Sequence, residues 1–257
     1  MKLATWNVNS IRARLERLLR WLDAQKPDLL CLQELKATEE QFPFPEIEAA
    51  GYHAAVCGQK TYNGVAILSR TPLQEVEAGF GRPDDDPAAR LISARAGELR
   101  VISAYVPNGQ TVGSEKWAYK LAWLRQLRAH LDRTAHPQDQ LVLCGDLNIA
   151  PEARDVANPA AWEGSVLYCP EARAALQEVR AFGLIDAFRL HHAEGGLYSW
   201  WDYRMLAFPK NDGLRIDHVL VTEPLAPLCT SAFIDRKERK GQQPSDHAPV
   251  VVELALG

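Results

Sequence analysis

Several features that would assign a class of protein are scarce or absent from this sequence of 257 residues. Its five cysteines are odd in number, scattered and never arranged as C-x-x-C, which argues against disulfides or a cysteine zinc site and favours reduced core thiols. No apolar run approaches the roughly 18 to 20 residues of a membrane span, and no basic and apolar leader precedes MKLATWNVNS. We therefore expect a globular, soluble protein with no membrane partner, located in the cytoplasm.

The sequence also lacks an excess of basic charge. Its formal net charge is -4, which taken alone counts against a nucleic-acid partner, because binding phosphates usually requires a basic surface. Basic side chains do gather in two short segments: Arg12, Arg14, Arg17 and Arg20 in the first, and Arg236, Lys237, Arg239 and Lys240 in the second. Such runs are most often solvated surfaces. Charge therefore permits a nucleic-acid partner without indicating one.

The apolar pattern predicts a mixed fold with a substantial core. Residues 2–8 and 28–33 read as strands, and apolar residues spaced i, i+4, i+7 between Ile11 and Leu22 predict a helix that joins them as a parallel pair. Short strand candidates separated by turn residues predict an antiparallel meander over 52–106. The acidic run PDDDP at 83–87 is interpreted as a solvated turn.

The second half of the chain continues this alternation. Helices are predicted near 115–133 and 172–182, and strands near 141–145, 216–222, 228–234 and 247–254. Ten or more strands are too many for one open sheet, so we expect an α/β fold with two packed sheets and helices outside. Neither a linker nor a repeat divides the sequence, and residues 1–257 are expected to form a single domain.

Five apolar runs adjoin hydrogen-bonding or ionisable side chains. They are TWNVNS (5–10), LLCLQELK (29–36), LVLCGDLN (141–148), LRIDHVLV (214–221) and SDHAPVVVEL (245–254). One polar strand end is ordinary, whereas five spread over the whole length predict carboxylates, amides and an imidazole that converge on one hydrated cleft able to bind a metal.

The spacing within these runs indicates which side chains share a face. Asp146 and Asn148 are two residues apart, as are Asn7 and Asn9, so each pair leaves the same face of an extended backbone. Such pairs also simply make turns, which leaves both interpretations open for either pair alone. Glu34 follows a densely apolar run, and a buried carboxylate there needs a partner or a divalent cation.

The adjacent residues Asp246 and His247 would point to opposite faces of a strand, so only a loop before APVVVEL lets both reach one site. A lone histidine near a strand start is more often structural. Here Asp217, which enters another strand, fits a carboxylate that orients the imidazole.

Between residues 5 and 250 the chain contains, in this order, TWNVNSIRAR, LQELK, YNGVAILSR, AYVPNG, GDLNIAP, SWWDYR, GLRIDHVL and PSDHAPV. This series resembles the exonuclease III family of apurinic/apyrimidinic endonucleases, within the wider endonuclease/exonuclease/phosphatase superfamily. GDLN and SDHAPV mark the superfamily, whereas LQELK, AYVPNG and SWWDYR point to its DNA-repair branch. The resemblance implies a four-layer α/β sandwich of the deoxyribonuclease I type, with two packed mixed β-sheets flanked by helices.

The resemblance also implies a metal site. In that family the glutamate of LQE-x-K, here Glu34, binds Mg²⁺ or Mn²⁺, and Asp246 and Asn9 lie close to the metal. Some branches have aspartate at the position of Asn9, so this chain has one negative charge fewer, and we expect looser metal binding. The family leaves open whether one metal or two act.

Catalytic roles follow from the same resemblance. Asp146 would position and deprotonate the attacking water, with Asn7 and Asn148 fixing its carboxylate and the scissile phosphate. The family leaves open whether the aspartate or the histidine is the base.

The phosphate would be held from the other side. His247, paired with Asp217, would donate to a non-bridging phosphate oxygen, and Tyr105 would hold the same phosphate, so that the metal and the imidazolium stabilise a pentacovalent state.

Substrate choice is assigned to other residues. The resemblance places Trp200, Leu214 and Ile216 around an apolar pocket for an extrahelical abasic deoxyribose, and it makes Asn108 and the two basic segments contacts to backbone phosphates. Without the ordered motifs, the three apolar residues would read as ordinary strand packing.

The implied function is Mg²⁺-dependent cleavage 5′ to abasic sites in duplex DNA, which leaves a 3′-hydroxyl, with 3′ to 5′ exonuclease and 3′-phosphatase side activities. The partner would be double-stranded DNA with abasic sites or blocked 3′ ends, bound by a monomer. One alternative is a superfamily phosphatase acting on a small phosphoester, against which SWWDYR and AYVPNG argue. The other is a catalytically silent, nucleic-acid-binding relative, against which the retained acidic residues and histidine argue.

Overall fold

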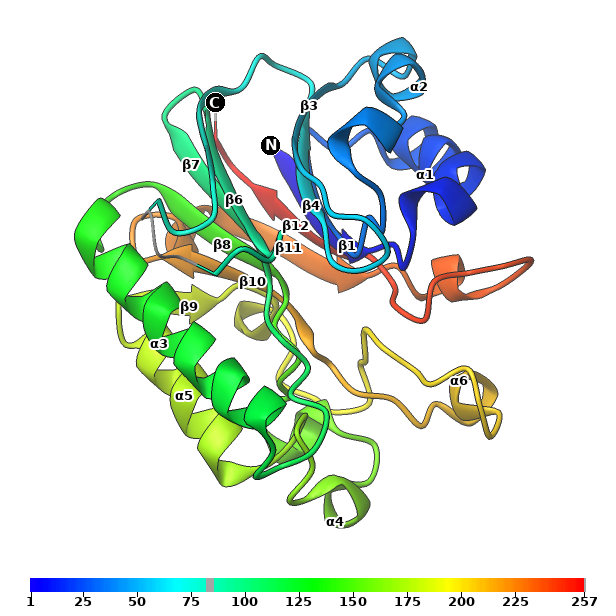
Figure 1. Cartoon of the computed structure of the whole chain (residues 1–257), viewed down its shortest axis with the longest axis vertical. Coiled ribbons are helices and arrows are strands. Elements are labelled where there is room, and N and C mark those ends of the chain that lie inside the picture. The colour runs from blue at the N-terminus through cyan, green and yellow to red at the C-terminus, as the bar shows by residue number, and fades with distance from the viewer. Residues whose placement is uncertain (82–85, 257) are drawn as a thin grey trace.

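The computed structural model describes residues 1–81 and 86–256, which form four layers of the kind expected from the sequence (Figure 1). Within these residues, two six-stranded sheets pack face to face. Helices α1 (Ile11–Gln25) and α2 (Phe44–Ala49) lie outside one sheet, and α3 (Glu115–Thr134) and α5 (Pro170–Arg180) lie outside the other (Figure 1). The predicted four-layer α/β sandwich with two mixed sheets is confirmed.

The first sheet has the strand order β11-β12-β1-β2-β4-β3. Its strands, in that order, are Cys229–Ile234, Val250–Leu254, Lys2–Asn7, Leu29–Gln33, Val65–Ser69 and His53–Cys57. β1 and β2 are parallel and joined by α1, as predicted, while the neighbouring pairs are antiparallel. Ser10 caps α1 by accepting a hydrogen bond from the Ala13 amide, and Lys26, in a left-handed conformation, ends it before Pro27.

The second sheet has the order β5-β6-β7-β8-β10-β9. Its strands, in that order, are Gln74–Ala78, Leu91–Ala96, Leu99–Tyr105, Leu141–Asp146, Asp217–Thr222 and Leu184–Asp186. β7 and β8 are parallel and joined by α3, and β10 runs antiparallel to β8. The antiparallel pairing expected over 52–106 is present, but β3 and β4 belong to the first sheet whereas β5, β6 and β7 belong to the second. The expectation of a single meander is therefore wrong.

Short elements complete the described residues. They are helices α4 (Pro159–Trp162) and α6 (Ala207–Lys210) and 3₁₀ turns at Glu39–Gln41, Ala153–Asp155, Phe188–Leu190, Ala226–Leu228 and Arg236–Arg239. The first three residues of the PDDDP run lie outside the described residues. Among the helices described, none has the length and apolar character needed to cross a bilayer.

The core explains why the central strands read as continuous apolar runs. In β8, Val142 and Cys144 point between the two sheets, whereas Leu141 and Leu143 point toward α3 and α5. All four side chains are fully buried, because each central strand is covered on both faces. Alternating polarity is therefore lost in β8, and its ionisable residue, Asp146, stands at the end of the strand.

Strand direction brings the polar residues of all five runs to one edge of the sandwich. β1, β2 and β8 end there, while β10 begins there and β12 begins shortly after His247. Asp217 pairs in register with Asp146 across the antiparallel β10 and β8. The amino ends of two strands therefore meet the carboxyl ends of three others, which places residues from positions 7 to 247 side by side.

Candidate active site

The amide of Asn7 links two carboxylates at this edge. Asn7 is the last residue of β1 and is fully buried. Its Nδ2 atom donates to Glu34 Oε1 at 2.8 Å and to Asp146 Oδ2 at 2.9 Å. One side-chain amide thus sets the positions of both acidic groups.

Asp146 lies at the end of β8 with 1% of its surface exposed. Its other oxygen, Oδ1, accepts from the backbone amide of Asn148 at 2.9 Å, and the left-handed conformation of Asn148 (φ 51°) turns the chain to make this contact. Burial raises the pKa of Asp146 to about 7, against the opposing charge of His247. A carboxylate with this pKa is suited to accept a proton near neutral pH.

Two further amides extend this arrangement outward. Asn148 Nδ2 donates to Val106 O at 3.0 Å, which frees its Oδ1 to accept from Asn108 Nδ2 at 3.1 Å. Asn108 is exposed, so the pair connects the buried carboxylate to the surface of the cleft.

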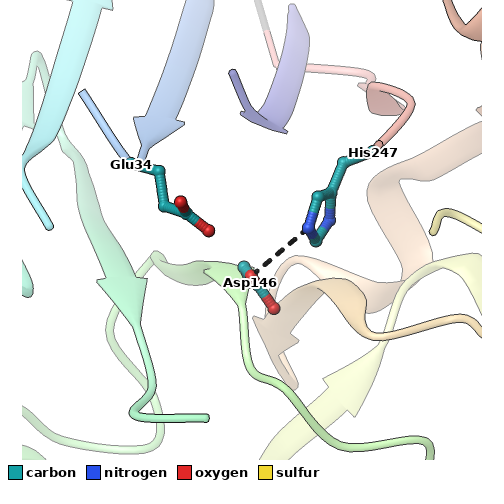
Figure 2. A group of neighbouring side chains, drawn as sticks. All are labelled: Glu34, Asp146 and His247. Carbon is teal, nitrogen blue, oxygen red and sulfur yellow. Dashed lines mark ion pairs between the residues drawn. The ribbon is translucent and has the colours of Figure 1, made fainter. Parts of the chain in front are cut away.

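His247 forms an ion pair with Asp217. Its Nδ1 lies 2.8 Å from Asp217 Oδ2. Its Nε2 lies 3.7 Å from Asp146 Oδ2, and Figure 2 marks this second ion pair. Burial of the ring lowers its pKa, but the charges of Asp217 and Asp146 outweigh burial and raise the pKa of His247 to about 10. The ring is therefore an imidazolium at neutral pH, with Nε2–H directed toward the cleft side of Asp146.

Glu34 follows β2 in a left-handed conformation, which turns its side chain toward Asp146 (Figure 2). Its Oε1 also accepts from the Tyr105 hydroxyl at 3.0 Å, and its Oε2 pairs with Lys36 Nζ at 2.9 Å. Burial and the charges of Glu34 and Asp146 raise the pKa of Tyr105 well above its usual value. Tyr105 therefore remains a hydrogen-bond donor throughout the neutral range.

The three residues predicted to surround a metal are connected through Lys36. Its ammonium donates to Asn9 Oδ1 at 2.5 Å as well as to Glu34, and Asn9 Nδ2 donates to Asp246 Oδ1 at 2.9 Å. Trp200 Nε1 donates to the other oxygen of Asp246 at 3.0 Å. Each carboxylate oxygen of Asp246 thus accepts one side-chain hydrogen bond, and Asp246 is connected to Glu34 only through Asn9 and Lys36 among the described hydrogen bonds.

The donor atoms at this edge fit a hard divalent cation. Within the described residues, ligand atoms of Glu34, Asp146 and His247 lie within 4.8 Å of one another (Figure 2). The two carboxylates supply oxygen ligands of the type that Mg²⁺ and Mn²⁺ prefer. The Lys36 ammonium contacts side-chain oxygen atoms of both Glu34 and Asn9, so this part of the site already binds a positive charge.

The residues assigned to substrate choice lie together beside His247. Leu214 and Ile216 are buried in one cluster with Tyr168, and the partly exposed Trp200 packs against it. Trp200 pairs with both Leu214 and His247 through isolated β-bridges. The backbone of Trp200 therefore lies beside that of His247, and the apolar group is close to the catalytic edge.

Glu34 also lines a cavity of about 580 Å³. Tyr105 and Asn108 line it, together with the basic residues Lys36, Arg90 and Lys116. Arg90 lies over the Tyr105 ring, 4.7 Å from its centroid. The cleft thus combines an acidic centre with a basic and aromatic flank.

The two basic segments of the sequence adjoin each other in space. Arg17 Nη1 pairs with Glu238 Oε2 at 2.9 Å, and its Nη2 donates to the Lys240 and Gln242 carbonyls. Arg239 is largely buried and donates to Trp201 O at 3.1 Å. Several of these cations are therefore held by the protein itself, while Arg12 and Arg20 are exposed.

Sequence reasoning assigned no role to several residues that hold this site together. Besides Lys36, they include Ser199, whose Oγ accepts from the Asp217 amide at 3.0 Å, and Ser245, whose Oγ donates to Asn7 O at 2.7 Å. Lys36 and Ser245 stand inside motifs that were recognised, within two residues of Glu34 and His247. Their position beside predicted site residues could have identified them from the sequence.

Comparisons with known proteins agree with the architecture. Residues 4–247 match the Endonuclease/Exonuclease/phosphatase family. "Exodeoxyribonuclease III" of Haemophilus influenzae is 35% identical over 266 residues, which cover 99% of this chain and 100% of that protein. An AP endonuclease from Archaeoglobus fulgidus superposes with a TM-score of 0.97 at 39% identity, with 100% of both chains covered.

A further solved structure, the 3′ phosphatase NExo from Neisseria bound to product DNA hairpin, superposes with a TM-score of 0.95 at 40% identity over 99% of both chains. The resemblance recognised in the ordered motifs is thereby confirmed. The chain belongs to the Endonuclease/Exonuclease/phosphatase family, and within it to the exodeoxyribonuclease III group of DNA repair nucleases.

Proposed function

We propose that this DNA repair nuclease is Mg²⁺-dependent and cuts duplex DNA 5′ to abasic sites, leaving a 3′-hydroxyl. The observation that carries the proposal is the position of the buried Asp146 carboxylate. Asn7 links it to Glu34 on one side, and on the other side it lies next to His247, which is paired with Asp217. The relatives named as an AP endonuclease and as a 3′ phosphatase support both the abasic substrate and 3′-end processing as a side activity.

In this proposal Asp146 is the general base. It orients a water for attack on the phosphorus through Oδ1 and Oδ2 and accepts its proton, for which a pKa of about 7 is suited. The amides of Asn7 and Asn148 hold the carboxylate in place through both oxygens. A divalent cation held by Glu34, with Asp146 beside it and Asp246 connected through Asn9, would supply Lewis-acid stabilisation of the phosphate.

Donors on two sides would stabilise the charge that develops on the phosphate. His247 Nε2–H and the Tyr105 hydroxyl both remain protonated at neutral pH, and both lie at the edge that holds Asp146. Preorganised donors in a site shielded from water stabilise a transition state more than they do in bulk solvent. Asn108, at the cleft surface, would hold an adjacent phosphate.

The first test is incision of a labelled duplex that contains one tetrahydrofuran abasic analogue. The wild-type protein is expected to cut it with Mg²⁺ and not with EDTA, and Glu34→Ala is expected to raise the Mg²⁺ concentration for half-maximal rate by at least about 10-fold, because an oxygen ligand is lost. Glu40→Ala, an exposed glutamate outside the site, serves as the matched control.

The result also separates the alternatives. If the duplex stays intact with Mg²⁺ but a small phosphoester is hydrolysed, the phosphatase alternative is correct. Binding of the duplex with no hydrolysis of either substrate would identify a catalytically silent nucleic-acid-binding protein.

The apolar group beside His247 is proposed as the pocket for the abasic deoxyribose. In this proposal the sugar of an abasic nucleotide packs against the apolar group of Trp200, Leu214 and Ile216, and a base attached to that sugar would hinder the contact. Trp200→Ala or Leu214→Ala is expected to lower the preference for abasic over intact duplex by at least about 10-fold.

This preference is measured as the ratio of kcat/KM values for matched abasic and intact duplexes. The control is Leu190→Ala, which truncates an exposed leucine outside the pocket. A ratio that stays at the wild-type value in both pocket variants would contradict the assignment.

We further propose that residues 1–257 act as one domain, as a monomer in the cytoplasm. One chain supplies each of the proposed catalytic residues from both sheets, which supports a single functional domain. The five cysteines are free, and four of them are buried, which suits a reducing compartment. Sedimentation of the protein with and without duplex tests the monomer.

A further inference from the structure

Lys120 occupies an apolar position of helix α3. Trp117, Lys120, Leu124, Leu127 and Leu131 follow one another at spacings of three and four residues and are buried on one face of the helix. Lys120 has no exposed surface. A lysine in the middle of such a stripe is unusual, because long charged side chains are almost never fully buried without a partner.

The ammonium of Lys120 is bound by three backbone carbonyls from three separate segments. Its Nζ donates to Val166 O at 2.6 Å, to Asn148 O at 2.8 Å and to Asn108 O at 3.1 Å. All three hydrogens of the ammonium are used. Within the part of the chain that the structure describes, no carboxylate lies within ion-pairing distance of this nitrogen.

The segments that meet at Lys120 have little regular structure of their own. Residues 106–110, 147–151 and 163–168 lie outside the strands and helices. Gly109, in a left-handed conformation, lies so close to the lysine stem that an added Cβ would come within 3.1 Å of Lys120 Cδ. The side chain therefore passes through the junction of these loops and fixes their separation.

Stability alone accounts poorly for this arrangement. Burying an ammonium removes its hydration and is unfavourable, and this burial lowers the pKa of Lys120 to about 7, although the charge of Asp146 opposes the shift. A buried charge without an ionic partner seldom stabilises a fold more than an apolar residue of similar shape. A methionine could fill the same space, but it has no donor with which to hold the three carbonyls in place.

Each of the three segments carries part of the proposed site. Asn108 and Asn148 are hydrogen-bonded to each other, and the Asn148 amide holds Asp146. In the third segment Leu167 O accepts from the Ala150 amide at 2.8 Å, and Leu167 packs in the cluster that contains Leu214. Lys120 thus connects the phosphate-binding amides to the wall of the substrate pocket.

We propose that Lys120 is a positioning residue, whose ammonium holds the loops bearing Asn108, Asn148 and Val166 in the arrangement that incision requires. This inference rests on the proposed function, because its effect is on the incision step. It differs from a catalytic role, since the nitrogen has no exposed surface and cannot touch DNA.

The test compares Lys120→Met, Lys120→Gln and Asn148→Ala, and also the double variant of Lys120→Met with Asn148→Ala, on the abasic duplex at saturating Mg²⁺. Lys120→Met is expected to lower kcat by about 10²-fold, the loss typical of misplaced catalytic groups, with KM changed by less than about threefold. Lys120→Gln retains a donor and is expected to recover part of the rate. Lys120 is proposed to affect incision mainly by placing Asn148 and the Asn108 amide bonded to it, so the double variant should be no slower than the slower single variant.

Arg125→Met, on the exposed face of the same helix, is the matched control and should match the wild type. Additive losses in the double variant, or a Lys120→Gln as slow as Lys120→Met, would overturn the positioning role. If Lys120→Met does not fold by circular dichroism, Lys120→Gln alone decides: a rate within about twofold of wild type with an altered KM contradicts the inference. Failure of the wild type to cut would instead refute the proposed function.

Discussion

Replacing Asp146 with asparagine is expected to lower kcat for abasic-site incision by about 10³-fold, within the range that a general base contributes. The substitution preserves shape but removes the oxygen that accepts from Asn7 and the group whose pKa of about 7 allows it to take a proton from water. An amide Nδ2 placed against the Asn7 amide would also oppose donor to donor. The measurement is single-turnover incision of the tetrahydrofuran duplex at pH 7.5.

The control for this loss is Asp132→Asn, an exposed acid on α3 that pairs with Arg128. Binding of the duplex should persist in Asp146→Asn, because the loss of one buried negative charge near a phosphate reduces repulsion. A residual rate within about 10-fold of the wild type would rule out Asp146 as the base, since even a weak general base contributes about 10²-fold. That result would move the role to His247, the other base that the family leaves open.

The motifs at strand ends were readable because central strands buried on both faces are mostly apolar, so a cluster of ionisable and amide side chains marks the sheet edge. Asn7 and Asp146 are the last residues of their strands, and Glu34 directly follows β2. Asp217 begins β10 and His247 precedes β12, and sequence alone does not tell that antiparallel β10 and β12 bring these amino ends to the same edge. The sequence therefore predicted that these polar residues share one site, and the directions of the strands explain why they do.

The sheet assignment of residues 52–106 was not predictable from local pattern. β3 and β4 form a hairpin-like pair, as do β6 and β7, and both pairs show the same short apolar runs and turn residues. Which sheet each pair joins depends on its far partner, β2 for β4 and β8 for β7. Such contacts between distant residues leave no periodic signal in the sequence.

Two features of the site were also hidden. The contact of Asn9 with both Lys36 and Asp246 depends on a left-handed turn at Asn9 (φ 46°), which the alternating-face argument for Asn7 and Asn9 does not include. Lys120 was visible only as a charged residue on the apolar stripe of α3. A charged residue at an apolar position of a helix is therefore a signal worth following toward nearby loops.

Asp217→Asn is expected to lower kcat by about 10²- to 10⁴-fold and to change how the rate depends on pH. The loss arises because an asparagine no longer stabilises the imidazolium or fixes its tautomer. In the wild type the rate should rise with pH as Asp146 loses its proton near pH 7, and it should fall only when His247 loses its proton near pH 10. The variant retains a change due to Asp146, but it loses the charge of Asp217, which raises the pKa of Asp146 in the wild type.

The second change should move to lower pH in Asp217→Asn. Burial lowers the pKa of His247, and in the variant the charge of Asp217 no longer opposes this effect. The pKa of His247 therefore falls toward its ordinary value of about 6.5. In the wild type, the stability contributed by this imidazolium is fully present below about pH 6.5 and is lost as pH rises through about 10. The variant should therefore be less stable than the wild type mainly at low pH, and the difference should shrink as pH rises toward about 10.

Both effects are measurable on one pair of proteins. Titration of the His247 ring protons by NMR between pH 5 and 11 gives the two pKa values directly, and unfolding by urea at pH 6 and pH 9 gives the change in stability. Asp23→Asn, an exposed acid on α1, is the control. If His247 has the same pKa in Asp217→Asn as in the wild type, Asp217 does not hold the proton on the ring, and the role assigned to the ion pair fails even if the rate is reduced.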